Sequence, residues 1–430
     1  MKKLLILTLA LVILFASCGK PPVYLPEASP GGAVKDNWTY ETPEAGPYEG
    51  AFKNLSSQLY MEDGALYFDG GLGDGKLVPM RLNLATGNLT AVCPDPVCAH
   101  DTTECPLYGT RDFLPIEFAG HTQYLVLRRY YDQRQTLTGW ETVRVEQLER
   151  YDPTGGKSVV LETYDGNYGL GPEVYLGQYR FYMSSDYDEE GKWVGGLTRM
   201  NLENGRRELL WPQEDAMPLL AKDGRVWASN GGELFSFDGL AEDPASTWRT
   251  EREGLFPLTG TFSTDGINLY YPSAQDGMLR IVPLDGGEEA EIDLPFAKGY
   301  GIVTAAGGWL TYFSGGDTDL GKADIRGYAS TVVELNGEEF RRCRPDGTED
   351  QCVFRFEGEY ASFRPLHIAA DGRYLYCTYS WWEDPDGDGV YRDGDQHYSF
   401  PVNGHDNCSL LRIDCETGEA KIITIREGTK

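Results

Sequence analysis

The sequence predicts an all-β protein, a β-propeller with seven four-stranded blades, and two repeated patterns predict it. The first is a turn with Gly followed by a short run of Leu, Val, Tyr, Trp or Phe, which we call the Gly–aromatic motif. It recurs about every 50 residues, an interval typical of solenoids, propellers or arrays. Its glycines are Gly64, Gly120, Gly177, Gly224, Gly266, Gly308 and Gly372.

The second pattern is an apolar strand that ends in a polar turn with Asp, Asn or Gly. It lies at residues 81–87, 150–155, 199–205, 234–239, 279–286, 342–347 and 411–418. Gly supplies the positive φ that such turns need, and Asp or Asn bonds its own backbone there. Each unit therefore has four strands, and each Gly–aromatic motif marks the step from the first strand to the second. Six or eight blades, or a large β-sandwich or two smaller β domains, are the alternatives.

The first 17 residues are predicted to be a lipoprotein signal peptide. A basic start precedes the apolar run Leu4 to Phe15, which is too short to span a bilayer. The run ends just before Cys18 in a segment that resembles a bacterial lipobox, although Phe15 stands where Leu is usual. We expect Cys18 to be lipidated; an ordinary secretory signal is the alternative. Residues 18–50 are rich in Pro, Gly and Glu, which is typical of a flexible tether, and residues 51–430 form the propeller domain.

The net charge of −29, from 67 acidic and 38 basic residues, argues against a nucleic-acid partner, which would need a basic face. Acidity of this size is typical of a protein kept soluble outside the cell. An anionic membrane surface would repel the domain, which agrees with attachment to the membrane through a lipid anchor.

Eight cysteines remain when Cys18 is set aside, and an even number in an exported protein predicts disulfides. Cys343 and Cys352 flank one turn of a predicted hairpin and are a candidate pair. Cys377 and Cys408 flank one long loop and are another.

A different cysteine cluster consists of Cys93, Cys98, His100 and Cys105. Three thiolates and an imidazole are ligands that suit zinc. The spacing matches no standard zinc knuckle, so we favour disulfides, one of them local and one to a distant cysteine such as Cys415. Zinc remains the alternative.

Residues 384–395 match an EF-hand-like calcium loop. Asp384, Asp386 and Asp388 stand at positions 1, 3 and 5, and Gly389 lets the chain turn sharply at position 6. Asp395 stands at position 12, where Glu is usual. We predict a calcium site; an ion-free acidic loop is the alternative.

Trp381 and Trp382, with Tyr391 across the same loop, are candidates for an aromatic platform that binds sugar rings. Packing between blades is the alternative role for these rings. The sequence has no Gly-x-Ser-x-Gly elbow and no His-Glu-x-x-His motif, so it names no catalytic residue.

The lipobox, the tether, the Gly–aromatic motif and the Cys-Pro-Asp-Pro-Val-Cys-Ala-His segment from Cys93 together resemble surface lipoproteins of Gram-positive, Clostridia-like bacteria, which carry TolB-like propellers. The resemblance covers residues 51–430. It implies a fold and a location at the cell surface, and it implies no activity, because propellers host both enzymes and binding platforms.

The sequence therefore predicts an exported, lipid-anchored protein that faces the outside and binds an extracellular protein, peptide or glycan on one face of the propeller. An enzyme acting on glycans, either a hydrolase or a lyase, is the first alternative, and a structural partner in a cell-envelope assembly is the second. An enzyme should show clustered carboxylates with perturbed pKa values, or a His, in the central funnel.

Strand order predicts which face carries the long segments. The loop from strand two to strand three and the connection to the next blade emerge on the same face, because antiparallel neighbours reverse at every turn. We assign the long segments 93–108, 131–140, 184–196, 315–330 and 381–405 to that face as loops. The Asp384 loop and the Cys93–Cys105 segment should be neighbours there once the ring closes.

Overall fold

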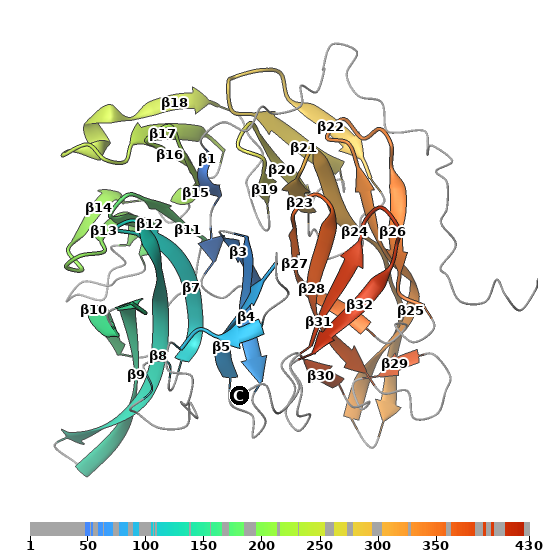
Figure 1. The fold of residues 1–430 in the computed structure, drawn as a ribbon, viewed down its shortest axis with the longest axis horizontal. Coiled ribbons are helices and arrows are strands. Elements are labelled where there is room, and N and C mark those ends of the chain that lie inside the picture. Colours follow the sequence, from blue (N-terminus) through green and yellow to red (C-terminus); the bar gives the residue numbers. More distant parts are fainter. Residues whose placement is uncertain are drawn as a thin grey trace, which may run out of the picture.

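The computed structural model describes residues 48–424, with gaps at residues 52, 55–58, 63, 72–76, 85–88, 94–104, 106, 108–109, 137–138, 155, 166–171, 185–194, 213–215, 231, 254–261, 273–277, 295–302, 326–327, 358–362, 383–389, 393–396 and 400–408. Strands dominate this part of the chain, and they form seven sheets arranged as the blades of a propeller (Figure 1). No helix within these ranges is both long and apolar enough to cross a membrane.

The first three blades are built from consecutive stretches of chain. Blade 1 contains β3 (Leu59–Glu62), β4 (Ala65–Gly71), β5 (Leu77–Asn83) and β6 (Leu89–Ala91). Blade 2 contains β7 (Thr110–Phe118), β8 (His121–Thr136), β9 (Gly139–Asp152) and β10 (Lys157–Asp165). Blade 3 contains β11 (Pro172–Leu176), β12 (Tyr179–Ser184), β13 (Gly196–Asn201) and β14 (Arg207–Trp211).

The next two blades continue the pattern. Blade 4 contains β15 (Ala216–Lys222), β16 (Arg225–Asn230), β17 (Leu234–Asp238) and β18 (Arg249–Arg252), with a short 3₁₀ helix η1 (Pro244–Thr247) before the last strand. Blade 5 contains β19 (Ser263–Thr264), β20 (Asn268–Pro272), β21 (Met278–Pro283) and β22 (Ala290–Asp293).

The last two blades each receive a further strand from the long insertion of blade 7. Blade 6 contains β23 (Val303–Ala306), β24 (Trp309–Ile325), β25 (Tyr328–Cys343) and β26 (Gln351–Arg355), and β29 (Val390–Arg392) pairs with β25. Blade 7 contains β27 (Phe363–Ala370), β28 (Tyr374–Trp382), β31 (Ser409–Asp414) and β32 (Ala420–Thr424), and β30 (His397–Ser399) pairs with β28.

The blade count predicted from the sequence is confirmed. In every blade the glycine of the Gly–aromatic motif lies between the first and second strands. The turn at Gly64, for example, joins β3 to β4 with Gly64 at a φ of 65°. A positive φ is disfavoured for residues with a side chain, so the turn explains why Gly marks each unit.

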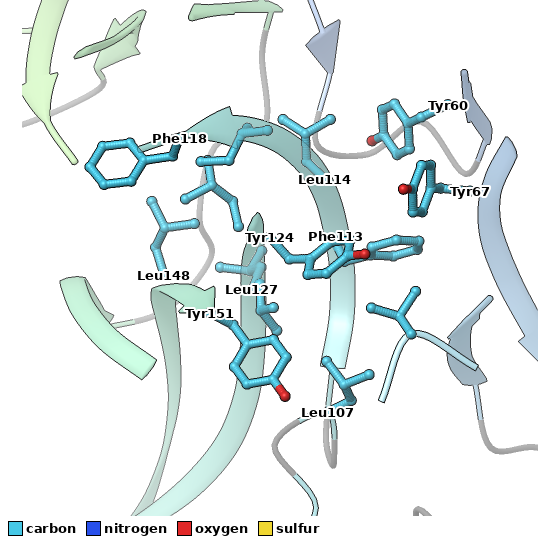
Figure 2. Packing of buried hydrophobic residues seen from close by; sticks show 14 of the residues in the cluster. Tyr60, Tyr67, Leu107, Phe113, Leu114, Phe118, Tyr124, Leu127, Leu148 and Tyr151 are labelled. Atoms are coloured by element: carbon cyan, nitrogen blue, oxygen red, sulfur yellow. The ribbon is translucent and has the colours of Figure 1, made fainter. Parts of the chain in front are cut away.

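The blades pack through apolar side chains from neighbouring sheets. Between blades 1 and 2, the rings of Tyr67 and Tyr124 meet edge to face with their centroids 6.0 Å apart, and Tyr60 meets Phe113 in the same way (Figure 2). Between blades 3 and 4, the Trp211 ring stacks on Trp248 at 4.3 Å. The aromatic residues therefore fill the spaces between tilted sheets, as such packing requires.

The first strands of the blades lie nearest the axis. First strands of neighbouring blades contact each other, as β11 contacts β15 and β19 contacts β23. The ring closes where β27 of blade 7 contacts β3 of blade 1, so these two blades are neighbours as predicted. Two short strands that precede blade 1, β1 (Tyr48–Ala51) and β2 (Lys53–Asn54), pair with the first strands of blades 4 and 3.

Two of the segments expected to be long loops are instead long strands. The segment 131–140 belongs to β8 and β9, and the segment 315–330 belongs to β24 and β25. In each hairpin the antiparallel register continues far beyond the blade, from Tyr124 opposite Tyr151 to Thr136 opposite Gly139 in the first. The backbone groups of these segments are thus paired with each other, which a loop would leave unpaired.

Candidate functional site

The connections of the propeller divide between two faces. Strand direction places every connection from strand two to strand three, and every connection between blades, on one face, which we call the long-loop face. The turns from strand one to two and from strand three to four lie on the opposite face, the turn face. The end of β28 and the start of β31 therefore lie at the long-loop face, and so do the end of β6 and the start of β7.

The β8–β9 hairpin extends from blade 2 at the long-loop face. Tyr131 lies opposite Arg144, Gln133 opposite Thr142 and Gln135 opposite Trp140. Side chains alternate along a strand, so these six residues share one side of the hairpin, which we call the ribbon surface.

Two aromatic rings dominate the ribbon surface. Tyr131 is 67% exposed and Trp140 is 70% exposed, although large aromatic side chains elsewhere in the described residues are mostly buried. Gln135, the residue opposite Trp140, is four residue steps from Tyr131, so the two aromatic positions are about 13 Å apart along the ribbon at ~3.3 Å per residue. Between them the Gln133 amide donates a hydrogen bond to the Thr142 hydroxyl at 2.6 Å.

Ion pairs hold the base of the ribbon to the blade. The Arg129 guanidinium donates to the Glu146 carboxylate at 2.9 Å, and Arg144 lies 3.5 Å from the same carboxylate. The Glu146 side chain is fully buried. This side of the hairpin thus combines two exposed rings, amide and hydroxyl groups and one guanidinium, a set that suits stacking and hydrogen bonding with a neutral polar ligand.

The three aromatic residues predicted to form a platform lie on separate strands. Trp381 and Trp382 end β28 and pair with Tyr398 and His397 of β30, in blade 7. Tyr391 lies on β29, opposite Val333 of blade 6. The backbone therefore places the Trp pair and Tyr391 on different sheets, and the platform stays a prediction.

Several predicted site residues lie outside the described residues. They are the lipidation residue Cys18, the calcium ligands Asp384, Asp386, Asp388 and Asp395, the cluster members Cys98 and His100, and Cys408, the predicted partner of Cys377. Within the described ranges no three His, Cys, Asp or Glu side chains are grouped as metal ligands would be. Calcium, zinc and the Cys377–Cys408 disulfide stay predictions.

The structure brings the two described cysteines of the Cys93 cluster into one place. Cys93 and Cys105 are both buried in the apolar cluster between blades 1 and 2. Burial is the main cause that raises the pKa of the nearby Tyr151 phenol to about 12, and the two cysteines contribute to that rise. The two described cysteines of the segment therefore lie in the same apolar cluster, near Tyr151.

The predicted Cys343–Cys352 disulfide is not formed in the structure, where both residues are free thiols. Cys352 lies opposite Arg341 in the hairpin register, so Cys343 stands two residues further along β25 and faces it diagonally. Burial raises the pKa of the Cys352 thiol to about 11, and the neighbouring Glu339 carboxylate adds to this effect.

A buried ion pair lies near the axis in blade 3. The Arg180 guanidinium donates to Glu173 at 2.6 Å and 3.0 Å, and their side chains are 0% and 1% exposed. Burial raises the pKa of the Glu173 carboxyl to about 8, and a hydrogen bond from the Tyr175 hydroxyl opposes that rise. The pair is closed to solvent, so this carboxyl is a structural group.

Sequence reasoning placed residues 131–140 on the correct face but did not name Tyr131 and Trp140 as ligand-binding candidates. One sequence signal could have indicated them. Tyr131, Gln133 and Gln135 stand at every second position, which is the period of side chains on one solvated side of a strand. The sequence does not reveal the strand register, which places Trp140 opposite Gln135 on the same side of the hairpin.

No protein-family model matches the chain, and no curated protein matches it. Among solved structures, a puromycin-hydrolyzing peptidase of Mycobacterium tuberculosis is 15% identical, covers 86% of this chain and has a TM-score of 0.38; this chain spans about half (53%) of that protein. An oligogalacturonate lyase from Vibrio parahaemolyticus is 13% identical, with 88% of this chain and 92% of that chain covered and a TM-score of 0.45. TolB from Acinetobacter baumannii is 10% identical, with 70% and 80% covered and a TM-score of 0.29. At these identities and TM-scores, none of the three carries an argument about function.

Proposed function

We propose that the protein is an exported binding protein, held at the cell membrane by a lipid on Cys18, that takes an extracellular ligand on the long-loop face. The observation that carries the proposal is the ribbon surface, where Tyr131 and Trp140 are exposed on a continuously paired hairpin. Exposed Trp and Tyr on a fixed scaffold supply contact area at low conformational-entropy cost. Amide and hydroxyl groups lie between the rings, and a glycan presents both C–H faces and hydroxyls to such a set.

A glycan-acting enzyme would need a reactive carboxyl that substrate can reach. Among the described residues, the carboxyl with a raised pKa is Glu173, which is ion-paired with Arg180 and 1% exposed. The exposed groups of the ribbon surface include no carboxylate pair. Binding is therefore the function that we propose for the ribbon surface, and a glycan-acting enzyme stays the alternative.

A glycan and peptidoglycan array tests the binding proposal directly. The wild-type protein should bind a defined set of glycans, and Trp140→Ala and Tyr131→Ala should each weaken that binding at least tenfold. The control is Leu240→Ala, because Leu240 is also an exposed apolar residue, at 52%, but follows the third strand of blade 4 and so lies on the turn face. A wild-type protein that binds no glycan, or a Trp140→Ala protein that binds as wild type does, would overturn the proposal.

The lipid anchor needs a separate measurement. Mass spectrometry of the mature N-terminus should find a diacylglyceryl-modified Cys18, and Cys18→Ala should leave the protein released or unprocessed. A mature N-terminus at another residue without lipid would refute the anchor and leave the ligand-binding proposal standing.

A further inference from the structure

The central channel contains part of the chain itself. Strand β1 pairs with β15 of blade 4, with Tyr48 opposite Lys222 and Ala51 opposite Leu220. β15 is the first strand of its blade and already pairs with β16 on its other edge. The edge that β1 covers is therefore the one that faces the axis, and Figure 1 shows β1 beside β15 and β11 within the ring.

Strand β2 repeats this arrangement in the next blade. Lys53 lies opposite Glu173 and Asn54 opposite Pro172, on the axial edge of β11 in blade 3. Contacts between β1 and β11 join the two pairings. Residues 48–54 thus add one strand to the inner edge of each of two adjacent blades.

The direction of these strands fixes how the segment crosses the channel. β15 runs from Ala216 at the long-loop face to Lys222, next to the turn at Gly224 on the turn face. Tyr48 lies opposite Lys222, at the turn face. Asn54 lies opposite Pro172, the first residue of β11, at the long-loop face. The six residue steps between them span about 20 Å at ~3.3 Å per residue, as a crossing from face to face requires.

We infer that the N-terminal segment threads the central channel from the turn face to the long-loop face before blade 1 begins. Pairing with two inner edges keeps the segment in place, because each antiparallel pairing satisfies backbone groups that the channel would otherwise leave open. The described segment therefore begins at the turn face, where Tyr48 lies opposite Lys222. Together with the proposed anchor at Cys18, on which this part of the inference rests, this starting point favours an orientation with the long-loop face and its ribbon surface away from the membrane.

A cysteine cross-link in the full chain tests the threading independently of the anchor and of any ligand. Gly50 lies opposite Ala221 in the β1–β15 register, within the distance that a disulfide spans. Gly50→Cys with Ala221→Cys should form a disulfide under mild oxidation, identified by mass spectrometry of the linked peptides. The matched control pairs Gly50→Cys with Thr304→Cys on β23, the first strand of blade 6, which should give no such link.

Hydrogen exchange in the wild-type protein supplies a second measurement that needs no substitution. Peptides covering residues 48–54 should exchange at least a hundredfold more slowly than the same peptides in denaturant. Exchange at the unstructured rate, or equal cross-linking to residues 221 and 304, would overturn the threading.

Orientation on a membrane is tested with the lipidated protein in vesicles that carry an acceptor dye. A fluorescent amino acid at Glu203, in the turn between β13 and β14, should transfer energy to the membrane more efficiently than one at Gln135 on the ribbon surface. Equal or reversed efficiencies would refute the outward orientation. Protein that does not join the vesicles at all would refute the anchor instead, while the cross-link result would stand.

Discussion

Gly307 and Gly372 touch each other at the boundary between blades 6 and 7. A Cβ atom on Gly307 would lie 2.8 Å from the Cα of Gly372, and both residues have a positive φ, of 59° and 91°. Each glycine belongs to the turn between the first and second strands of its blade. Gly372, the glycine of the repeated motif in blade 7, thus has a second role, because it also lets blades 6 and 7 approach each other at the turn face.

Gly372→Ala should therefore destabilise the protein more than Gly64→Ala. The Gly64 site has the same kind of turn, with a φ of 65° and nothing within 4 Å of an added Cβ, so the control carries only the backbone strain of about 1–2 kcal/mol. At Gly372 the clash with Gly307 should add about 1–3 kcal/mol. Urea unfolding midpoints of the two variants give the comparison, and equal losses would contradict the close contact.

The Glu173–Arg180 pair should be essential for folding of blade 3. At pH 9, where the Glu173 carboxyl with its pKa of about 8 is ionised, Glu173→Gln leaves a buried guanidinium without its counter-charge and should cost about 3–5 kcal/mol in the free energy of unfolding. In the same blade, Glu208 accepts hydrogen bonds from Arg199 at 2.6 Å and 3.2 Å but is 46% exposed. Glu208→Gln should cost about 1 kcal/mol or less, because water screens that pair. Similar losses for both variants would show that Glu173 is less buried than the structure indicates.

Alkaline pH should unfold the protein. Burial raises the pKa of Tyr271 and Tyr376 to about 12, above the ordinary phenol value of 10.0, and that of the Cys415 thiol to about 11, above 9.0. Because these folded-state pKa values are raised, the stability they contribute is fully present below about pH 9 and is lost as pH rises through 11 to 12. Tyrosinate absorbance and circular dichroism should change together in that window. Complete ionisation of all 27 tyrosines near pH 10, with the circular dichroism unchanged, would contradict the burial of these groups.

Trp140→Ala should leave folding unchanged. The Trp140 ring is 70% exposed, so its removal should change the free energy of unfolding by no more than about 0.5 kcal/mol. Phe313, which is 1% exposed between blades 6 and 7, is the contrast, and Phe313→Ala should cost about 3–5 kcal/mol. Thermal unfolding of both variants decides whether a loss of ligand binding by Trp140→Ala can be read as a loss of contact.

The predicted calcium loop connects Trp382, at the end of β28, to β29, which pairs with blade 6. An ion bound there would hold together the segment that connects blade 7 to blade 6, and it should raise the melting temperature of the protein. By mass action the gain could reach ~2.7 kcal/mol at a hundredfold excess over Kd. Asp386→Ala together with Asp388→Ala should abolish the gain, with calcium against chelator as the comparison. Wild-type protein that melts alike in calcium and chelator would leave the loop an ordinary acidic segment.

The sequence by itself determined the number of blades and the face on which the long segments emerge. The turns at Gly64 and Gly372 are local features, because positive φ and the strand period of two are set by residues close together along the chain. Antiparallel alternation alone then determines the face on which each connection emerges.

Only the tertiary structure decided which residues meet. Gly307 contacts Gly372, β29 of blade 7 pairs with blade 6, and residues 48–54 lie in the channel against blades 3 and 4. The exposed Tyr131 and Trp140 also share a side only because the β8–β9 register continues beyond the blade. These relationships join residues that are far apart in the chain, or depend on a register that composition does not encode. They follow from closure of the ring and from the satisfaction of backbone hydrogen bonds along exposed strand edges.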